Sequence, residues 1–458
     1  MIAPMYPYQS AAAADIVAGK QVYLGFDPGL GKSRTALDAA QRRKVKRLLV
    51  ICPASGRYVW ESEAKKWASG MPFHMVTGIK DLGKLKNDGI VVITYGLLSI
   101  RDSAFVAMIT KGAPFDMTIL DEAAAVKNSG ANRTRSILTK MLPKLGYLLP
   151  MSGTPAPNHA GELFPILRAI YPQALTLGGA PGRIMNEHEF QDHFCKVVNK
   201  SFGTAKQIRV IEGSKNLPEL RQRMNGFMLR VKKEDVLKDL PPIRWDVVPV
   251  DADLANMPPV PMLGSVALDA LNAGDDETFM KYLAGATGEE HVMRLRRILG
   301  LAKVSAAVGY LQDFMDGLPA HKNQKILVFA HHREVIAMLE AGLASHSPVV
   351  ITGASTPTER SNAVNDFLSL GRHRVMVANI AAAGTGLTLV GPYCKCSDVF
   401  FVEASYSVGD NVQAASRVHR IGQSDAVIAR MLTAHGTIDD RIQSILARKA
   451  QDFNQLFN

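Results

Sequence analysis

The chain has 458 residues, 47% of them hydrophobic and 21% charged, with 53 Lys and Arg against 42 Asp and Glu. This composition is typical of a globular protein, and the length predicts two or three domains. The four cysteines are scattered, which excludes a disulfide framework and a zinc site built from four closely spaced ligands. The net charge of +11 suits a polyanionic partner but does not identify one.

The N-terminal residues MIAPMYPYQS contain no basic stretch followed by a long apolar run, so we expect no signal peptide. No uninterrupted apolar run reaches the roughly 20 residues that a membrane-spanning helix needs. We therefore expect a protein of a reducing compartment, the cytoplasm, without membrane contact.

Five short apolar runs occur in the first third of the chain, each followed by small or polar residues. They cover residues 21–26, 47–53, 90–95, 117–122 and 147–153. Because they are rich in Val and Ile and do not alternate strictly, they predict strands that are buried on both faces of a sheet. A helix-like pattern at 32–43 separates the first two runs.

The middle of the chain, about 160–300, has few strand-like runs. Helical patterns cover residues 187–198, 217–237, 276–286 and 289–304. Residues 191–240 hold 11 Lys and Arg against 6 Asp and Glu, an excess of 11 − 6 = +5. We expect a helical basic protrusion from about residue 165 and a link in the Pro-rich stretch 238–262, although a solvated helix face explains the charge equally well.

A second block of apolar runs follows at 325–330, 348–353, 374–380, 397–403 and 427–432, with helical patterns at 357–368 and 437–453. Strand–helix alternation in two blocks predicts two α/β lobes with parallel sheets and helical insertions between them. The predicted boundaries are 1–240 for the first lobe, 241–300 for a linker with a helical segment, and 301–458 for the second lobe.

The stretch GFDPGLGKS at 25–33 follows an apolar run and leads into a helical pattern. Glycines let backbone N–H groups close around phosphates, Lys32 reaches the terminal phosphates, and Ser33 is a Mg²⁺ ligand in such loops. Phe26 stands where the strict phosphate-loop pattern has glycine. Alone, the stretch is equally compatible with a Gly-rich turn before a basic helix.

The stretch ILDEAAAVKN at 119–128 places Asp121 and Glu122 at the end of another apolar run. An acidic helix start is the simpler interpretation. However, a phosphate loop and a carboxylate pair at two strand ends match the ligand-binding edge of an open parallel sheet. Asp121 would then hold Mg²⁺ through water, and Glu122 would orient and deprotonate the attacking water.

Two further stretches follow in order. MSGTPAPN at 151–158 suits a loop whose Ser and Thr change hydrogen bonds when a phosphate leaves. In QAASRVHRIGQ at 413–423, Arg417 and Arg420 are three residues apart and would share one face of a helix. Two guanidiniums aimed at a γ-phosphate would stabilise the transferring charge, although a single RxxR pair is more often a surface feature.

With these stretches in this order, the chain resembles the helicase-type motors of superfamily 2, most closely the Swi/Snf-like DNA translocases near the annealing-helicase-related branch. The string RVHRIGQ is the most family-specific part. The other matching segments are residues 6–9, 25–33, 48–67 with Trp60, Glu61 and Trp67, 93–98, 121–128, 152–163, 226–242, 326–335 and 381–389. The resemblance implies two RecA-like lobes and the P-loop NTPase fold.

The resemblance also implies the roles of particular residues. ATP and Mg²⁺ would bind between the lobes, with Gln9 as the adenine reader. The first lobe would supply Gly29, Leu30, Gly31, Lys32, Ser33, Asp121 and Glu122, and the second lobe Gly384, Gly386, Arg417 and Arg420. Ser33 and Asp121 would hold the metal.

The partner that the resemblance implies is double-stranded or forked DNA, bound mostly through its phosphate backbone. Ser55, Thr94, Thr352 and Asn379 would contact that backbone. We expect a monomeric, bare motor without accessory domains, from a bacterial or virus-infected bacterial cell. A strand-separating DNA or RNA helicase and a non-hydrolysing, nucleotide-gated DNA-binding scaffold remain the alternatives.

One departure from the family pattern concerns Ala124, which stands where the family has a histidine that links hydrolysis to lobe movement. Lys32, the carboxylate pair and both arginines are retained, so we expect an active DNA-dependent ATPase. We hypothesise that coupling runs differently here, through Ser152, Thr154 or a residue of the second lobe such as Gln413.

Overall fold

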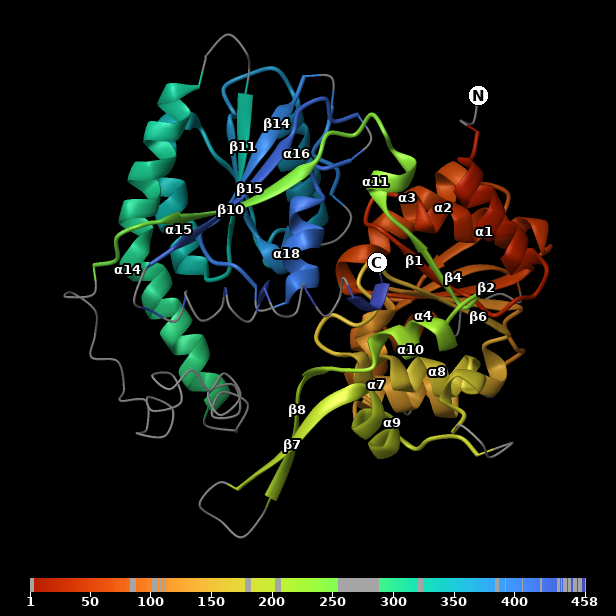
Figure 1. Cartoon of the computed structure of the whole chain (residues 1–458). Helices are drawn as coiled ribbons and strands as arrows, with labels where there is room; N and C mark the ends of the chain where they lie inside the picture. The colour runs from red at the N-terminus through yellow and green to blue at the C-terminus, as the bar shows by residue number, and fades with distance from the viewer. Residues whose placement is uncertain are drawn as a thin grey trace. The chain divides into compact units, whose positions relative to one another are not determined.

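The computed structural model describes residues 4–82, 88–100, 105–107, 109, 112–177, 183–201, 207–253, 288–318, 324–383, 387–391, 393–405, 407–420, 422–434, 437, 439, 443, 446–447, 451 and 455–457. The chain divides into two compact units. Unit 1 is Met1–Val236 with Lys449–Asn458, and unit 2 is Leu237–Arg448. Each unit contains a parallel sheet with helices (Figure 1). The predicted α/β class with two parallel-sheet lobes is thereby confirmed.

The sheet of unit 1 has seven strands in the order β3-β4-β2-β5-β6-β1-β9, all parallel. The strands are β1 Tyr23–Phe26, β2 Arg47–Cys52, β3 Phe73–Met75, β4 Gly89–Thr94, β5 Met117–Asp121, β6 Tyr147–Met151 and β9 Met228–Val231. Strand β1 lies beside β6, and β6 lies beside β5. The carboxyl ends of these three strands therefore meet at one edge of the sheet, where parallel sheets bind ligands.

Helices cover both faces of this sheet, with α1, α2 and α3 on one side and α8 and α10 on the other (Figure 1). The helices of unit 1 are α1 Pro7–Val17, α2 Lys32–Arg42, α3 Arg57–Trp67, α4 Ile79–Leu82, α5 Tyr95–Ile100, α7 Asn132–Arg135, α8 Phe164–Ile170, α9 Glu187–Phe194, α10 Leu217–Arg223 and α11 Lys233–Val236. Buried side chains of the strands and of the segment 160–227 form one large core. Coverage on both faces explains why the strands of this sheet have apolar sequences without alternation.

The sheet of unit 2 has six parallel strands in the order β10-β15-β14-β11-β13-β12. They are β10 Ile243–Pro249, β11 Gln324–Ala330, β12 Val349–Ile351, β13 Val375–Asn379, β14 Lys395–Phe401 and β15 Val427–Thr433. The helices are α14 Gly288–Gly317, α15 Arg333–Gly342, α16 Pro357–Leu368, α17 Ile380–Ala383 and α18 Val408–Ala415. Among the described residues, no helix has the length and apolarity needed to cross a membrane.

Strand β11 shows how unit 2 fills both faces of its sheet. Ile326 and Val328 pack in a core with α14 and α15, whereas Leu327 and Phe329 pack in a second core with α16 and α18. Alternate side chains of a strand point to opposite faces, so a continuous apolar run fills two cores at once.

The structure differs from the predicted domain boundaries at three places. Strand β10 falls in the predicted linker but pairs along its length with β15, as an edge strand of unit 2. Helix α14 runs across the predicted boundary at 300/301. Residues 449–458, assigned to the second lobe, belong to unit 1, where Leu456 and Phe457 join the core. The helix predicted at 276–286 lies outside the described residues, and that at 437–453 lies mostly outside them.

The segment predicted to be a helical basic protrusion contains the helices α8, α9 and α10, but residues 195–201 and 207–214 form strands instead. Helix α9 starts at a capping box, in which Asn186 and Glu189 exchange hydrogen bonds, and it ends at Phe194. The chain continues as an antiparallel hairpin, β7 Cys195–Ser201 with β8 Gln207–Ser214, which extends away from the sheet (Figure 1). The run of Val197 and Val198 favours the strand because β-branched side chains pack well on a pleated surface.

Candidate functional site: a phosphate loop beside a carboxylate pair

The segment between β1 and α2 has the backbone of a phosphate loop. Gly29 and Gly31 adopt left-handed conformations with φ of +90° and +76°. At Gly31 a Cβ would lie 2.4 Å from Nε2 of Gln9, so a larger residue does not fit there. Gly31 caps α2, an 11-residue helix whose N-terminal N–H groups favour anions. The loop therefore has the form that the sequence predicts for a phosphate cradle.

Lys32 is the first residue of α2 and points back toward the end of β1. Its Nζ donates a hydrogen bond to the carbonyl oxygen of Phe26 at 3.0 Å. Burial lowers the pKa of Lys32, whereas the negative charges of Glu122 and Asp121 raise it. Lys32 thus lies within electrostatic reach of both predicted carboxylates, as a residue that contacts terminal phosphates must.

Asp121 ends β5 and is partly buried, with its carboxylate bonded to a side chain of α3. Oδ2 accepts a hydrogen bond from the indole Nε1 of Trp60 at 2.8 Å. Burial and then the charge of Glu122 raise the pKa of Asp121 to about 7, although Trp60 and Lys32 oppose this shift. The raised pKa means that the surroundings of this carboxylate pair do not fully stabilise two negative charges.

Glu122 has a strained backbone with φ of +51°, a conformation that costs L-residues about 1–2 kcal/mol. Its Oε2 accepts a hydrogen bond from the hydroxyl of Ser152 at 2.9 Å. The same hydroxyl oxygen accepts the backbone N–H of Thr154 at 3.1 Å. The predicted water-activating carboxylate is therefore bonded to the loop that follows β6.

The chemistry of these residues fits a magnesium ion. Carboxylate and hydroxyl oxygens are the donors that Mg²⁺ prefers, and Asp121 at the end of β5 and Ser33 in the first turn of α2 supply one of each. The raised pKa of Asp121 points the same way, because a divalent cation would relieve the repulsion within the carboxylate pair. ATP and Mg²⁺ thus fit the residues present.

The unusual residues of the phosphate loop are part of the packing of unit 1. Phe26 is fully buried and meets the ring of Tyr8 edge to face at 5.5 Å. Asp27 Oδ1 forms an ion pair with Arg230 at 2.7 Å, and Asp27 Oδ2 accepts the backbone N–H of Lys233 at 3.0 Å. These contacts anchor the loop to β9 and the residues after it.

Pro28 packs directly on the loop that follows β6. A Cβ at Gly153 would lie 2.8 Å from Cδ of Pro28, so only glycine allows this approach. Pro28 of the phosphate loop is therefore matched by a glycine in the loop that contacts Glu122.

Gln9 lies against the phosphate loop with its side-chain amide engaged. Nε2 donates to the carbonyl oxygen of Leu30 at 3.1 Å, and Oε1 accepts the backbone N–H of Tyr6 at 3.0 Å. The residue is 3% exposed. Gln9 therefore supports the loop, and its role as adenine reader stays a prediction.

Besides the bond between Glu122 and Ser152, a second contact joins the segments after β5 and β6, and the sequence does not predict it. Lys127 forms an ion pair with Glu162 at 2.8 Å, and the Glu162 side chain is 6% exposed. Asn158 donates its side-chain amide to Glu162 at 2.6 Å and its backbone N–H at 3.0 Å. Ala124, on the same segment as Lys127, is partly buried.

In unit 2 the two predicted arginines do not lie on a helix. Helix α18 ends at Ala415, and Arg417 and Arg420 follow in a turn. Arg417 is 3% exposed and donates through Nη1 to the carbonyl oxygen of Leu387 at 3.3 Å. Arg420 donates through Nη1 to the hydroxyl of Thr388 at 2.7 Å. Both arginines thus reach the segment that follows Gly384 and Gly386, which lie outside the described residues.

Other residues of the RVHRIGQ string hold this turn in place. His419 Nε2 lies 2.8 Å from the carbonyl oxygen of Pro241, and Gln423 Nε2 donates to the carbonyl oxygen of Cys396 at 2.8 Å. Gln413, predicted to take part in coupling, lies on α18 and is partly buried. The family-specific string therefore serves to position a turn as well as to supply two arginines.

The four predicted DNA contacts all lie where strands end. Ser55 is in the turn after β2, and Thr352 directly follows β12. Thr94 ends β4, is 4% exposed, and accepts the backbone N–H of Leu97. Asn379 ends β13, and its side chain donates to His331 and accepts from the backbone N–H groups of α17. Thr94 and Asn379 therefore shape their turns, and contact with DNA stays a prediction for all four.

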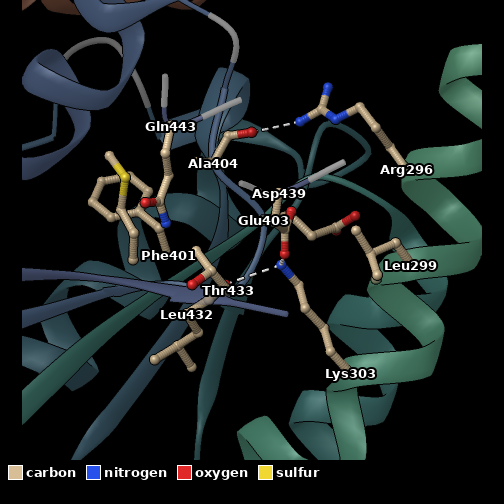
Figure 2. Close-up of a pocket in the computed structure, with 12 residues that line it drawn as sticks. Arg296, Leu299, Lys303, Phe401, Glu403, Ala404, Leu432, Thr433, Asp439 and Gln443 are labelled. Carbon is tan, nitrogen blue, oxygen red and sulfur yellow. Dashed lines mark hydrogen bonds and ion pairs between the residues drawn. The ribbon is translucent and has the colours of Figure 1, made fainter. Parts of the chain in front are cut away.

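A second cluster of charged residues lies around a small cavity in unit 2 (Figure 2). Lys303 of α14 forms an ion pair with Asp439 at 2.6 Å, with side chains 3% and 11% exposed. Glu403 accepts the backbone N–H groups of His331 and His332 at 2.9 Å and lies 2.6 Å from Nδ1 of His332. The cavity has a volume of about 20 Å³, enough for one water molecule. This cluster is therefore structural and not a nucleotide site.

Comparisons with known proteins identify the class. The model of the SNF2-related domain matches residues 23–256, just over half of the 458 residues, and the model of the helicase conserved C-terminal domain matches residues 307–422. The fold and site are thus those of a helicase-type ATPase. The chain belongs to the SNF2-related family. The resemblance drawn from the sequence motifs and the expected ATPase class are confirmed.

Two relatives and one solved structure illustrate the match. DNA annealing helicase and endonuclease ZRANB3 of Mus musculus is 32% identical over 92% of this chain and 38% of the mouse protein. A SWI/SNF-related matrix-associated actin-dependent regulator of chromatin subfamily A-like protein 1 homolog of Caenorhabditis elegans is 28% identical over 100% of this chain and 62% of the nematode protein. The Sulfolobus solfataricus SWI2/SNF2 ATPase core in complex with dsDNA is 22% identical, with a TM-score of 0.43 over 99% of this chain and 92% of that one. The chain spans less than two thirds of the length of either relative.

Proposed function

We propose that the chain is an ATP-driven translocase that moves along double-stranded or forked DNA. The observation that carries this proposal is the position of Lys32, Asp121 and Glu122, which lie within electrostatic reach of one another beside a phosphate loop in a member of the SNF2-related family. A phosphate-binding lysine after β1 and two carboxylates at the end of β5 are the groups that phosphoanhydride hydrolysis needs.

Each residue has a role in the proposed hydrolysis. The N–H groups of Gly29–Gly31 and the ammonium of Lys32 bind the β- and γ-phosphates. Glu122 accepts the proton of the attacking water. The oxygen of that water bonds to the γ-phosphorus, and the bond between the γ-phosphorus and the bridging β-phosphate oxygen breaks. Asp121 and Ser33 would hold Mg²⁺, which would neutralise charge on the phosphate oxygens. Arg417 and Arg420 are proposed to stabilise the γ-phosphate as it is transferred.

The proposed DNA partner is supported by the family and by charge. ZRANB3 is named as a DNA annealing helicase, and the net charge here is +11. Contacts to a phosphate backbone are independent of base sequence and weaken with salt, because they release bound counterions. The proposed translocase should therefore respond to the form of the nucleic acid more than to its sequence.

We further propose that coupling between hydrolysis and movement runs through Ser152. Its hydroxyl joins Glu122 to the backbone of Thr154, so a change at the γ-phosphate reaches the loop after β6 in two hydrogen bonds. Ala124 has no imidazole with which to make such a link. This arrangement supports the hypothesis that the chain retains coupling by another route.

The test is the steady-state rate of ATP hydrolysis with duplex DNA, forked DNA, single-stranded DNA and single-stranded RNA, each at low and moderate salt. We expect duplex and forked DNA to stimulate hydrolysis most, and stimulation to fall as salt rises. Equal stimulation by single-stranded RNA would refute the proposed substrate. Strand separation in the same samples would favour the helicase alternative, and DNA binding without phosphate release would favour the scaffold alternative.

A further inference from the structure

We propose that Trp60 is a positioning residue for nucleotide-bound Mg²⁺: its indole N–H fixes the Asp121 carboxylate in the orientation that receives the metal's coordination shell. This inference rests on the proposed function, because it assigns a role to Trp60 toward the metal that Asp121 would hold. The sequence places Trp60 in a family segment but indicates no task for its ring.

The first observation is the contact between the indole and the carboxylate. Trp60 lies on α3 and is 1% exposed, and its Nε1 donates to Asp121 Oδ2 at 2.8 Å. An indole N–H only donates, so it cannot exchange roles with its partner as a hydroxyl can. Asp121 therefore keeps one oxygen committed to α3.

A second aromatic residue holds the main chain of Asp121. The hydroxyl of Tyr95, at the start of α5, donates to the Asp121 carbonyl oxygen at 2.9 Å, and Tyr95 is 5% exposed. Two buried donors from different helices thus fix the side chain and the backbone of one residue. A carboxylate has about four acceptor positions, so the indole leaves others for water molecules of a metal ion.

The start of α3 is built to approach this carboxylate closely. A Cβ at Gly56, which caps α3, would lie 3.7 Å from Asp121 Oδ2 and 3.4 Å from Cβ of Cys52. The helix therefore begins in van der Waals reach of the carboxylate, with Trp60 one turn further along. Groups that orient metal ligands in this way typically change metal affinity by about 10–100-fold when they are removed.

The chain contains a matched control on the same helix. The indole of Trp67, also on α3, donates to Glu63 Oε2 at 3.1 Å within that helix. Trp67→Phe therefore removes the same N–H from the same helix without a change at Asp121. Trp60→Phe keeps most of the ring that fills the core and removes only the donor.

The experiment measures ATP affinity by titration calorimetry on the full chain, once with Mg²⁺ and once with EDTA. The ratio of the two dissociation constants is the gain in nucleotide affinity due to the metal, which equals the gain in metal affinity due to the nucleotide. We expect Trp60→Phe to reduce this ratio by about 10-fold. The affinity in EDTA should stay close to that of the wild type, and Trp67→Phe should leave both values unchanged.

Tyr95→Phe provides a second variant that removes a single hydroxyl, in case Trp60→Phe fails to fold. We expect it to reduce the metal-dependent gain less than Trp60→Phe does. The lost rate of ATP hydrolysis in both variants should return as Mg²⁺ is raised, a recovery that a packing defect would not show. A wild-type gain in Trp60→Phe, or in Tyr95→Phe if only that variant folds, overturns the inference. A wild-type protein without any metal-dependent gain overturns the assignment of Asp121, and with it the proposed function.

Discussion

Both units place acidic residues at or just beyond the end of a central strand of a parallel sheet, but the two environments shift the pKa values of these residues in opposite directions. In unit 1, burial and the neighbouring Glu122 raise the pKa of Asp121 to about 7. In unit 2, burial also raises the pKa of Glu403, but hydrogen bonds from the His332 ring and from the backbone of His331 and His332 outweigh it, so the pKa is lowered.

The difference distinguishes a carboxylate of a ligand-binding site, Asp121, from a carboxylate that stabilises the fold, Glu403. Glu403 is satisfied by groups of its own unit, and α14 closes over it so tightly that a Cβ at Gly300 would lie 2.6 Å from Oε1. The pKa of Asp121 is raised to about 7, as expected if its charge is balanced only in the proposed complex with Mg²⁺. Carboxylates with raised pKa values beside a ligand-binding loop are typical of functional sites, whereas satisfied carboxylates hold folds together.

The largest effect should follow loss of the water-activating carboxylate. Glu122→Gln keeps the size and the hydrogen bond with Ser152 but removes the base, so we expect a loss of about 10²–10⁴-fold in the rate of ATP hydrolysis, measured as phosphate release with duplex DNA. Lys32→Ala should abolish turnover, because it removes the cation that the phosphate loop places at the terminal phosphates.

The matched control is Glu403→Gln, the same substitution at the satisfied carboxylate of unit 2. It should keep most of the wild-type rate, because Glu403 contacts the turn after β11 and not the phosphate loop. Turnover like that of the wild type in Glu122→Gln would contradict the assignment of the nucleotide site to unit 1.

The next largest effect concerns the buried ion pair of unit 2. Lys303→Met leaves Asp439 buried without its cation, so we expect unit 2 to lose about 3–5 kcal/mol of its free energy of unfolding. Urea titration followed by the fluorescence of Trp245, the only tryptophan of unit 2, measures this loss.

The exposed pair of Lys65 and Glu61, with side chains 73% and 33% exposed, is the control for this substitution. Lys65→Met should cost unit 1 less than about 1 kcal/mol, followed by the fluorescence of Trp60 and Trp67, because surface ion pairs contribute little. If Lys303→Met reduced the free energy of unfolding no more than Lys65→Met, the charged cluster of unit 2 would not stabilise the fold as inferred here.

The sequence predicts the strands that carry the site because they are buried on both faces. Such strands appear as continuous apolar runs, so the ends of β1 and β5, and with them Lys32 and Asp121, are located correctly. The apolar runs do not predict the edge strands β9 and β10, since every residue of these strands is partly buried or exposed and charged residues such as Arg230 and Asp246 interrupt the pattern. An apolar run is thus a better guide to the centre of a sheet than to its edge.

Contacts between distant segments could not be predicted in the same way. The indole of Trp60 meets Asp121 across 61 positions of the chain, and no local pattern specifies which acceptor a buried indole will find. The spacing of Arg417 and Arg420 suggested a helix face, but α18 ends first at Ala415, and the bonds of His419 and Gln423 to other segments fix a turn. Tertiary contacts override local spacing at such positions.

The smallest effects concern how the free energy of unfolding changes with pH, and they should have opposite signs in the two units. The lowered pKa of Glu403 means that its ionised form stabilises the fold above the pKa of the unfolded chain, and that this contribution is lost as pH falls through the folded value. Glu403→Gln should therefore cost about 1–2 kcal/mol at pH 7 and less near pH 4, measured by urea unfolding.

Asp121→Asn should do the reverse in the absence of metal and nucleotide. The pKa of Asp121 is raised, so folding favours its protonated form: this stabilisation is complete below the pKa of the unfolded carboxyl and is lost as pH rises through the folded value of about 7. We expect the variant to gain about 1 kcal/mol over the wild type at pH 8 in EDTA, and the gain to shrink as pH falls below 7. The gain should also disappear when Mg²⁺ and ATP are added, because only the wild type then has a carboxylate for the metal. If Glu403→Gln and Asp121→Asn both reduced stability under all conditions, the two carboxylates would be alike. The Asp121 carboxylate would then not be an unbalanced charge that a cation could neutralise.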